Sequence, residues 1–161
     1  MRQKITVLGS FVVDLMARTP HLPAAGETVR GSRFKQGAGG KGFNQGVAAH
    51  KAGGNVSMVT KLGRDALGQV ALEAMDAVGM KKDFLFYSED VETGVALILV
   101  DEHASQNEIV VVPGACATLS DDDLAAVEMR SRIPLIWCSS WKSIRTRMKK
   151  LHASPRKTAS R

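Results

Sequence analysis

The stretch Gly37-Ala-Gly-Gly-Lys-Gly-Phe-Asn44 decides the fold, because it places four glycines within six residues directly before a helical pattern. Small and apolar residues recur at helical spacing from residue 40 to residue 52, and Gly53-Gly54 ends that pattern. Glycines at the start of a helix let the backbone approach a ligand closely, adopt positive φ and direct amide N–H groups outward. We therefore expect a glycine loop and a helix that together accept a ligand with hydroxyl groups or negative charge.

Outward from this loop, buried strands alternate with helices. Residues 5–9 form a β-branched apolar run that ends in Gly-Ser, which is typical of the first strand of a parallel sheet. Residues 56–62 predict the next buried strand, and residues 66–78 predict a second helix closed by Gly79. Aromatic residues make up only 5% of the chain, so we expect a core of aliphatic residues and Met. The alternation predicts an α/β fold with a parallel sheet.

More polar strands predict a small second sheet, a flap. Residues 11–17 and 28–35 predict two short strands separated by a turn-rich segment, and residues 95–100 and 108–112 predict a hairpin around a polar tip. The flap strands are therefore expected within about residues 11–36 and 93–112. A further short apolar strand is expected at residues 84–87.

A third helix is expected to begin after Ser120, which is followed by three aspartates. Serine is a favourable N-cap residue, and carboxylates are stabilised by the positive end of the helix dipole. Three adjacent carboxylates could also bind a metal ion, but capping is the simpler interpretation.

The glycine stretch also matches GxGxxG over residues 37–42, so a dinucleotide site has to be weighed. That fingerprint directly follows the first buried strand, whereas the segment after Gly9 is Ser-Phe-Val-Val-Asp and contains no glycine turn. A Walker loop does not fit, because Lys41 is followed by Gly42 rather than Ser or Thr. A purely structural loop remains the alternative to a ligand site.

Two polar side chains are expected close to this loop. Asp14 follows the first strand, where its carboxylate can accept hydrogen bonds from hydroxyl groups, and Asn44 lies in the first turn of the helix. The pair suits a polyol ligand. The alternative is that Asp14 is a solvated strand end and Asn44 a helix cap.

Five segments together resemble the PfkB-type carbohydrate kinases, in the order and spacing of ribokinases. They are Gly9-Ser-Phe-Val-Val-Asp14, Pro23-Ala-Ala-Gly-Glu-Thr28, Gly39-Gly-Lys-Gly-Phe-Asn-Gln45, Gly63-Arg-Asp-Ala-Leu-Gly68 and Thr93-Gly-Val-Ala-Leu-Ile98. The resemblance covers about residues 5–128.

The resemblance implies a ribokinase-like three-layer α/β sandwich with a parallel sheet, here truncated, in which the flap is a β-sheet lid. It implies that Asp14, Gly40, Lys41, Gly42 and Asn44 bind a small sugar such as ribose. The family transfers the γ-phosphoryl group of ATP to a sugar hydroxymethyl group, with Mg²⁺ and often a monovalent cation. A second subunit commonly packs on the lid, so a homodimer is expected.

The base used by this family is the Asp of a Gly-Ala-Gly-Asp motif, which does not occur in this sequence. We therefore assign no catalytic residue and no metal ligand, and expect the chain by itself to be inactive as a kinase. The alternatives are a non-catalytic sugar-binding or dimerisation module, or a pseudogene product.

Three positions depart from the family pattern. Val12 and Cys116 stand where Asn is usual, so one sugar contact is expected to be absent or replaced at position 12. Gly46 replaces a helical Ala, at a cost of about 1 kcal/mol. These departures indicate a divergent subfamily or relaxed selection.

The charge of the chain changes near Met129. Residues 1–128 carry a net charge of −4, whereas residues 129–161 contain 10 Lys and Arg and no acidic residue. A nucleic-acid-binding tail is one explanation. A change of reading frame is the preferred explanation. If the codons from Pro134 to Leu151 are read again starting at the third nucleotide of each, the genetic code permits an amino-acid sequence that resembles the ribokinase continuation. We therefore divide the chain into a kinase portion, 1–128, and an out-of-frame tail, 129–161.

The cellular setting is predicted from what the sequence does not contain. It has two cysteines and no CxxC, and no apolar run approaches the ~18 residues of a membrane span. The N-terminal residues lead into a strand pattern rather than a signal core. We expect a cytoplasmic protein with no membrane or nucleic-acid partner.

Overall fold

A computed structural model describes residues 4–131 and 135–137 of the chain. Within these residues it contains two four-stranded sheets, three α-helices and a short 3-10 helix. In chain order the elements are β1 (Lys4–Leu8), β2 (Val12–Thr19), β3 (Arg33–Gly39), α1 (Lys41–Lys51), β4 (Asn55–Gly63), α2 (Ala66–Ala77), β5 (Lys81–Ser88), β6 (Thr93–Asp101), β7 (Asn107–Gly114), η1 (Ala115–Thr118), α3 (Asp121–Ser131) and β8 (Leu135–Trp137).

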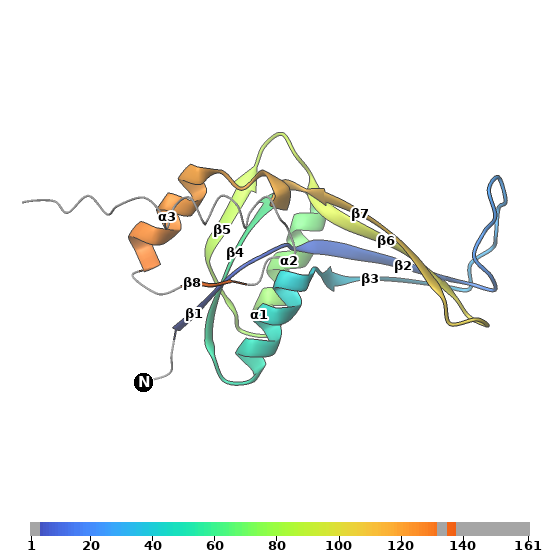
Figure 1. The fold of residues 1–161 in the computed structure, drawn as a ribbon, viewed down its shortest axis with the longest axis horizontal. Helices are drawn as coiled ribbons and strands as arrows, with labels where there is room; N and C mark the ends of the chain where they lie inside the picture. Colours follow the sequence, from blue (N-terminus) through green and yellow to red (C-terminus); the bar gives the residue numbers. More distant parts are fainter. Residues whose placement is uncertain (1–3, 132–134, 138–161) are drawn as a thin grey trace, which may run out of the picture.

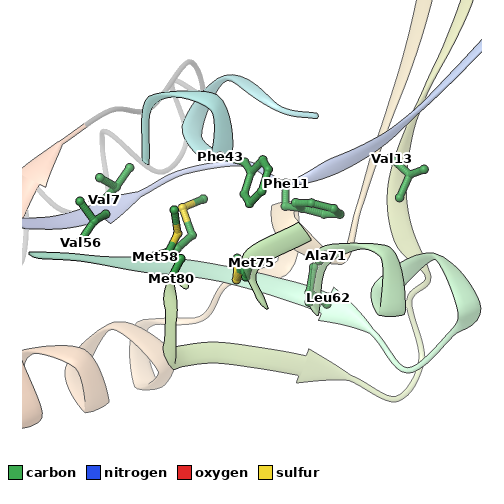
Figure 2. Close-up of a cluster of buried hydrophobic side chains, with 10 residues drawn as sticks. All are labelled: Val7, Phe11, Val13, Phe43, Val56, Met58, Leu62, Ala71, Met75 and Met80. Carbon is green, nitrogen blue, oxygen red and sulfur yellow. The ribbon is translucent and has the colours of Figure 1, made fainter. Parts of the chain in front are cut away.

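The first sheet, which we call the body sheet, has the order β5-β4-β1-β8, and all its described pairs are parallel. One face packs against α1 and α2 through the cluster drawn in Figure 2, which contains Phe43 of α1 together with Ala71 and Met75 of α2. The other face packs against α3 through Leu124 and Val127. The helix–sheet–helix layering confirms the prediction of an α/β fold with a parallel sheet.

The second sheet, which we call the lid sheet, has the order β3-β2-β6-β7. Strands β2 and β6 pair in parallel, whereas the outer strands β3 and β7 pair antiparallel with their neighbours. Figure 1 shows this sheet extending away from the body, with the loop between β2 and β3 at its far end. The predicted flap is therefore confirmed as a separate mixed sheet.

The boundaries of β3 differ from the prediction. A strand was expected at residues 28–35 and a glycine loop from residue 37, but β3 runs from Arg33 to Gly39. The cause is the pairing of β2 with β3, in which Val12 opposes Gly39 and Asp14 opposes Gly37. Ladder pairing from Val12 to Arg18 outweighs the low strand propensity of Gly37 and Gly39. The predicted loop is thus reduced to a single residue, Gly40.

The C-terminal part of the described chain reaches beyond residue 128, where the family resemblance was expected to end. Helix α3 continues to Ser131, and β8 pairs in parallel with β1 through Leu135, Ile136 and Trp137. Most of the predicted basic tail, residues 138–161, lies outside the described residues. The proposed change of reading frame stays a prediction.

Candidate functional site

The start of α1 is built directly onto the connection between β1 and β2. Gly40 is the N-cap, with a φ of 98°, and a Cβ there would lie 2.6 Å from the carbonyl oxygen of Ser10. A Cβ on Gly42 would lie 2.5 Å from Cα of Gly9. Both positions therefore require glycine, because a side chain would overlap the backbone beneath the helix.

Two further contacts hold α1 in this place. The N–H of Phe43 donates to the carbonyl of Ser10 at 3.1 Å. The rings of Phe43 and Phe11 meet edge to face, with centroids 5.2 Å apart and an interplanar angle of 85°. Figure 2 shows the two rings next to each other within the cluster of the body core. An aromatic pair of this geometry contributes about 1 kcal/mol beyond its buried area, so the helix start is firmly fixed.

Asp14 lies on β2, two residues beyond the start of the strand. Its carboxylate contacts the position that a Cβ on Gly39 would occupy, so the side chain extends toward the junction of β3 and α1. Asp14 is half-buried, and desolvation by burial raises the pKa of its carboxyl above the ordinary value. A partly desolvated carboxylate forms stronger hydrogen bonds to hydroxyl donors than one in bulk water.

The N-terminus of α1 adds positive character to the same junction. No side chain caps this helix, and its first turn contains no acidic residue. The Phe43 N–H already donates to Ser10. The N–H groups before it in a helix start that lacks a side-chain cap are available to an external acceptor, and the helix dipole favours negative or electron-rich groups there. The junction thus offers a carboxylate acceptor on β2 and backbone donors on α1.

The other predicted sugar-binding residues occupy this first turn. Lys41 and Asn44 are exposed, whereas Gly42 is buried. The N–H of Asn44 donates to the carbonyl of Gly40 at 2.9 Å, and Asn44 does not serve as the helix cap. Its side chain is therefore not required by the helix.

The three positions that depart from the family pattern, Val12, Gly46 and Cys116, are buried. Val12 is 5% exposed and faces Gly39 across the ladder, so an apolar side chain adjoins the junction. Cys116 lies in η1, where its thiol donates to the carbonyl of Pro113 at 3.0 Å and desolvation by burial raises its pKa to about 11. A thiol of this kind is a structural residue rather than a nucleophile.

The aspartates after Ser120 form a capping box. The hydroxyl of Ser120 accepts from the N–H of Asp123 at 3.1 Å, and the carboxylate of Asp123 accepts from the N–H of Ser120 at 2.9 Å. Lys61 of β4 also donates to Asp123, at 3.0 Å. The capping interpretation is confirmed.

Sequence reasoning did not assign Gly39 to the site. Its only signal was its place within the glycine stretch, and the contact with Asp14 depends on the register of β2 and β3.

In the part of the chain that the structure describes, no helix is long and apolar enough to cross a membrane.

A parallel α/β body with a mixed lid sheet, and a glycine-lined polar junction where the two meet, define the class of the protein as ribokinase-like. The sequence model of the family described as "pfkB family carbohydrate kinase" matches residues 2–137, and the chain belongs to this family. This confirms the resemblance and the predicted fold class.

Individual relatives agree with that assignment. Ribokinase from Mus musculus is 37% identical over 135 residues, covering 83% of this chain and 42% of the relative. Deoxyribokinase from Salmonella typhi is 38% identical over 120 residues, covering 74% of this chain and 39% of the relative. The structure of Arabidopsis thaliana ribokinase complexed with ribose and ATP has a TM-score of 0.68 and 33% identity, over 79% of this chain and 43% of that one. The chain thus spans about two fifths of the length of these proteins.

Proposed function

We propose that this chain carries the sugar-binding part of a ribokinase-like kinase, which phosphorylates ribose or a similar small sugar with ATP, and that the chain alone does not catalyse the transfer. The observation that carries the proposal is the position of the Asp14 carboxylate, against Gly39 and toward the uncapped start of α1. A ribokinase relative whose structure holds ribose and ATP supports the choice of ligand.

The junction has the complementary groups that a polyol needs. Hydroxyl groups of the sugar donate to the carboxylate of Asp14, and their oxygens accept from backbone N–H groups at Gly40, Lys41 and Gly42. The amide of Asn44 can both donate and accept. A hydrogen bond to a charged group contributes about 1.5–3 kcal/mol, so Asp14 is expected to dominate the affinity.

The proposal for this chain is limited to sugar binding. ATP, Mg²⁺ and a monovalent cation belong to the complete family reaction, which depends on positioning and charge stabilisation of the transferred group. Among residues 4–131 and 135–137, no group of three His, Cys, Asp or Glu side chains is placed to hold a metal ion. The proposal assigns no step of phosphoryl transfer to residues of this chain, because the Gly-Ala-Gly-Asp motif that carries the base of the family does not occur in its sequence.

Calorimetric titration of the purified chain with ribose and with 2-deoxyribose tests the proposal. We expect binding of at least one sugar, and loss of that binding in Asp14→Ala. A coupled assay with ATP and the same sugars is expected to show no turnover. Appreciable turnover would contradict the second part of the proposal, and absence of all sugar binding would contradict the first.

A second candidate function, dimerisation through the lid sheet, is favoured by its exposed apolar side chains. These side chains, which lie on β3, β6 and β7, are Phe34, Leu97, Ile109, Val110, Val111 and Val112. The ladder register places Leu97, Val110 and Val112 on one face of the lid sheet. Exposed apolar side chains that share a face mark interaction sites on soluble proteins. Sedimentation of the chain at several concentrations is expected to show a dimer.

The out-of-frame origin of residues 129–161 is a separate proposal. It is supported by the abrupt loss of acidic residues after Glu128. Sequencing the gene tests it, because kinase codons are expected downstream in another frame.

A further inference from the structure

Four segments of chain join the lid sheet to the body. Two of them, residues 9–11 and Gly40, meet beneath the start of α1 and belong to the candidate site described above. The other two lie at the base of the hairpin made by β6 and β7, where the chain enters at Thr93 and leaves at Gly114. Figure 1 shows α2 of the body close to this base.

A single carboxylate links α2 to the base of the lid. One oxygen of Asp65 accepts from the N–H of Gly68 at 2.6 Å and thereby caps α2. The other oxygen accepts from the N–H of Thr93, the first residue of β6, at 2.7 Å. Burial by itself raises the pKa of Asp65, but these bonds together lower it below the ordinary value.

Thr93 is held by a second bond from the body. Its hydroxyl accepts from the N–H of Gly63, the last residue of β4, at 2.9 Å, and Thr93 is only 4% exposed. The N–H of Ala115 donates to the carbonyl of Glu92 at 2.8 Å, which ties the exit of β7 to the entry of β6. The start of β6 is therefore bound to β4, α2 and β7 at once.

The backbone around these bonds is packed without free space. A Cβ on Gly63 would lie 2.6 Å from the amide nitrogen of Thr93, and one on Gly68 would lie 2.5 Å from the carbonyl oxygen of Gly63. Gly114 has a φ of 56°, and a Cβ there would lie 2.5 Å from the amide nitrogen of Gly94. A lost bond at Asp65 cannot be replaced by a shift of these segments without overlap.

The anchor at Thr93 is connected to Asp14 through the strand register. Strand β6 pairs with β2 so that Ala96 is the partner of Asp14. Thr93 and Ala96 are three positions apart, which corresponds to about 10 Å along a strand. The position of β6 therefore sets where the Asp14 carboxylate stands relative to the start of α1.

We propose that Asp65 is a positioning residue of the sugar site, which acts through Thr93 by fixing the lid sheet to the body. This inference rests on the proposed sugar-binding function for the role of Asp14, but the anchoring itself can be tested without sugar. Asp65 touches no predicted sugar-binding residue, so its effect on the site passes through β6.

Asp123 provides a matched control. It is also a partly buried aspartate that accepts two hydrogen bonds at the start of a helix, but its partners Ser120 and Lys61 both belong to the body. Asp65→Ala and Asp123→Ala each remove a carboxylate that accepts two hydrogen bonds at the start of a helix, so they are expected to cost similar stability. Only Asp65→Ala removes a bond to the lid sheet.

Hydrogen–deuterium exchange of the full chain measures the anchoring, and calorimetric titration with ribose measures its effect on the site. In Asp65→Ala we expect amides of β6 and β7 to exchange about tenfold faster, because a hydrogen bond to a charged group is lost. We also expect weaker ribose binding by a similar factor. In Asp123→Ala both the lid exchange and the ribose affinity are expected to equal those of the wild type.

Milder variants cover the case in which Asp65→Ala does not fold. Thr93→Val keeps the shape of the side chain but removes the acceptor for the Gly63 N–H, whereas Thr93→Ser keeps the hydroxyl. Faster lid exchange in Thr93→Val, with wild-type exchange in Thr93→Ser, supports the inference. Equal effects of the Asp65 and Asp123 variants on the lid, or unchanged lid exchange in both Asp65→Ala and Thr93→Val, would overturn it. If the wild type binds no ribose, the sugar function fails, and the exchange result still decides the anchoring.

Discussion

The carboxylate of Asp14 lies directly against the backbone of Gly39, across the ladder that joins β2 to β3. A methyl group on Gly39 would occupy the space of both carboxylate oxygens. The absence of a side chain at residue 39 thus fixes the direction of the acid at residue 14, and Gly40 follows immediately as the N-cap of α1. Strand register and helix start together define the candidate site.

Substitution of Gly39 by Ala is expected to abolish or strongly weaken sugar binding. The methyl group displaces the Asp14 carboxylate, and loss of its hydrogen bonds to the sugar costs about 1.5–3 kcal/mol, or at least tenfold in affinity. Calorimetric titration with ribose measures the change. Gly37→Ala is the matched control, because it lies on the same strand and its Cβ would meet nothing within 4 Å. Equal effects of the two substitutions would contradict this role of Gly39.

Asp14→Asn is expected to raise the melting temperature at pH 7 while it weakens sugar binding. Burial raises the pKa of Asp14 above its ordinary value of 3.8, so the folded state binds the proton more tightly than the unfolded state. Stability linked to this proton is present at pH below 3.8 and is lost as pH rises through the folded pKa. Asn carries no charge in acid or at pH 7. The gain in melting temperature of Asp14→Asn over the wild type should therefore vanish in acid.

Thermal denaturation of both proteins between acid and neutral pH measures this difference. Asp76→Asn, at an exposed position on α2 that pairs with Lys82, is the control and is not expected to stabilise the protein at pH 7. If the melting temperature of Asp14→Asn falls below that of the wild type at pH 7, the charge on the Asp14 carboxylate does not destabilise the folded state.

Much of the fold could be predicted from local pattern. The β-branched run before Gly9 and the helical spacing after Gly40 each depend on neighbouring residues, and β1 and α1 lie where they were expected. A candidate site could be proposed from the sequence as well, because Asp14 and the glycines stand at the ends of these elements.

The remaining features depend on contacts between distant segments. The extension of β3 through Gly39 follows from its register with β2, and propensity alone argued for a loop there. The bond between Asp65 and Thr93 joins residues 28 positions apart, so no local pattern indicates it. By contrast, the cap at Ser120 could be predicted, because Ser120 and its partner Asp123 are only three positions apart.

A lysine placed on one face of β7 or on the other is expected to show which face of the lid sheet forms the proposed dimer interface. Val110 and Val111 are both exposed and are adjacent in the strand, so their side chains point to opposite faces of the lid sheet. We expect either Val110→Lys or Val111→Lys to be monomeric, while the other remains dimeric. A lysine in a desolvated apolar interface is strongly unfavourable.

Sedimentation velocity of the two variants measures this effect. Ala48→Lys, at an exposed position on α1 of the body, is the control for an added positive charge. Retention of the dimer by both β7 variants, or a monomeric wild type, would exclude the lid sheet as the interface.

Cys116 is expected to resist thiol reagents in the folded protein. Desolvation by burial raises its pKa to about 11, so at pH 8 only about one thiol in a thousand is the reactive thiolate. The thiol is also buried against η1 and the end of β7, so the reagent has no access without local opening. Labelling with a disulfide reagent in a Cys138→Ser background, with and without guanidinium chloride, measures the protection. We expect labelling to be slow in buffer and complete within the mixing period in denaturant, and equal rates in both would show that the base of β7 is open in the native state.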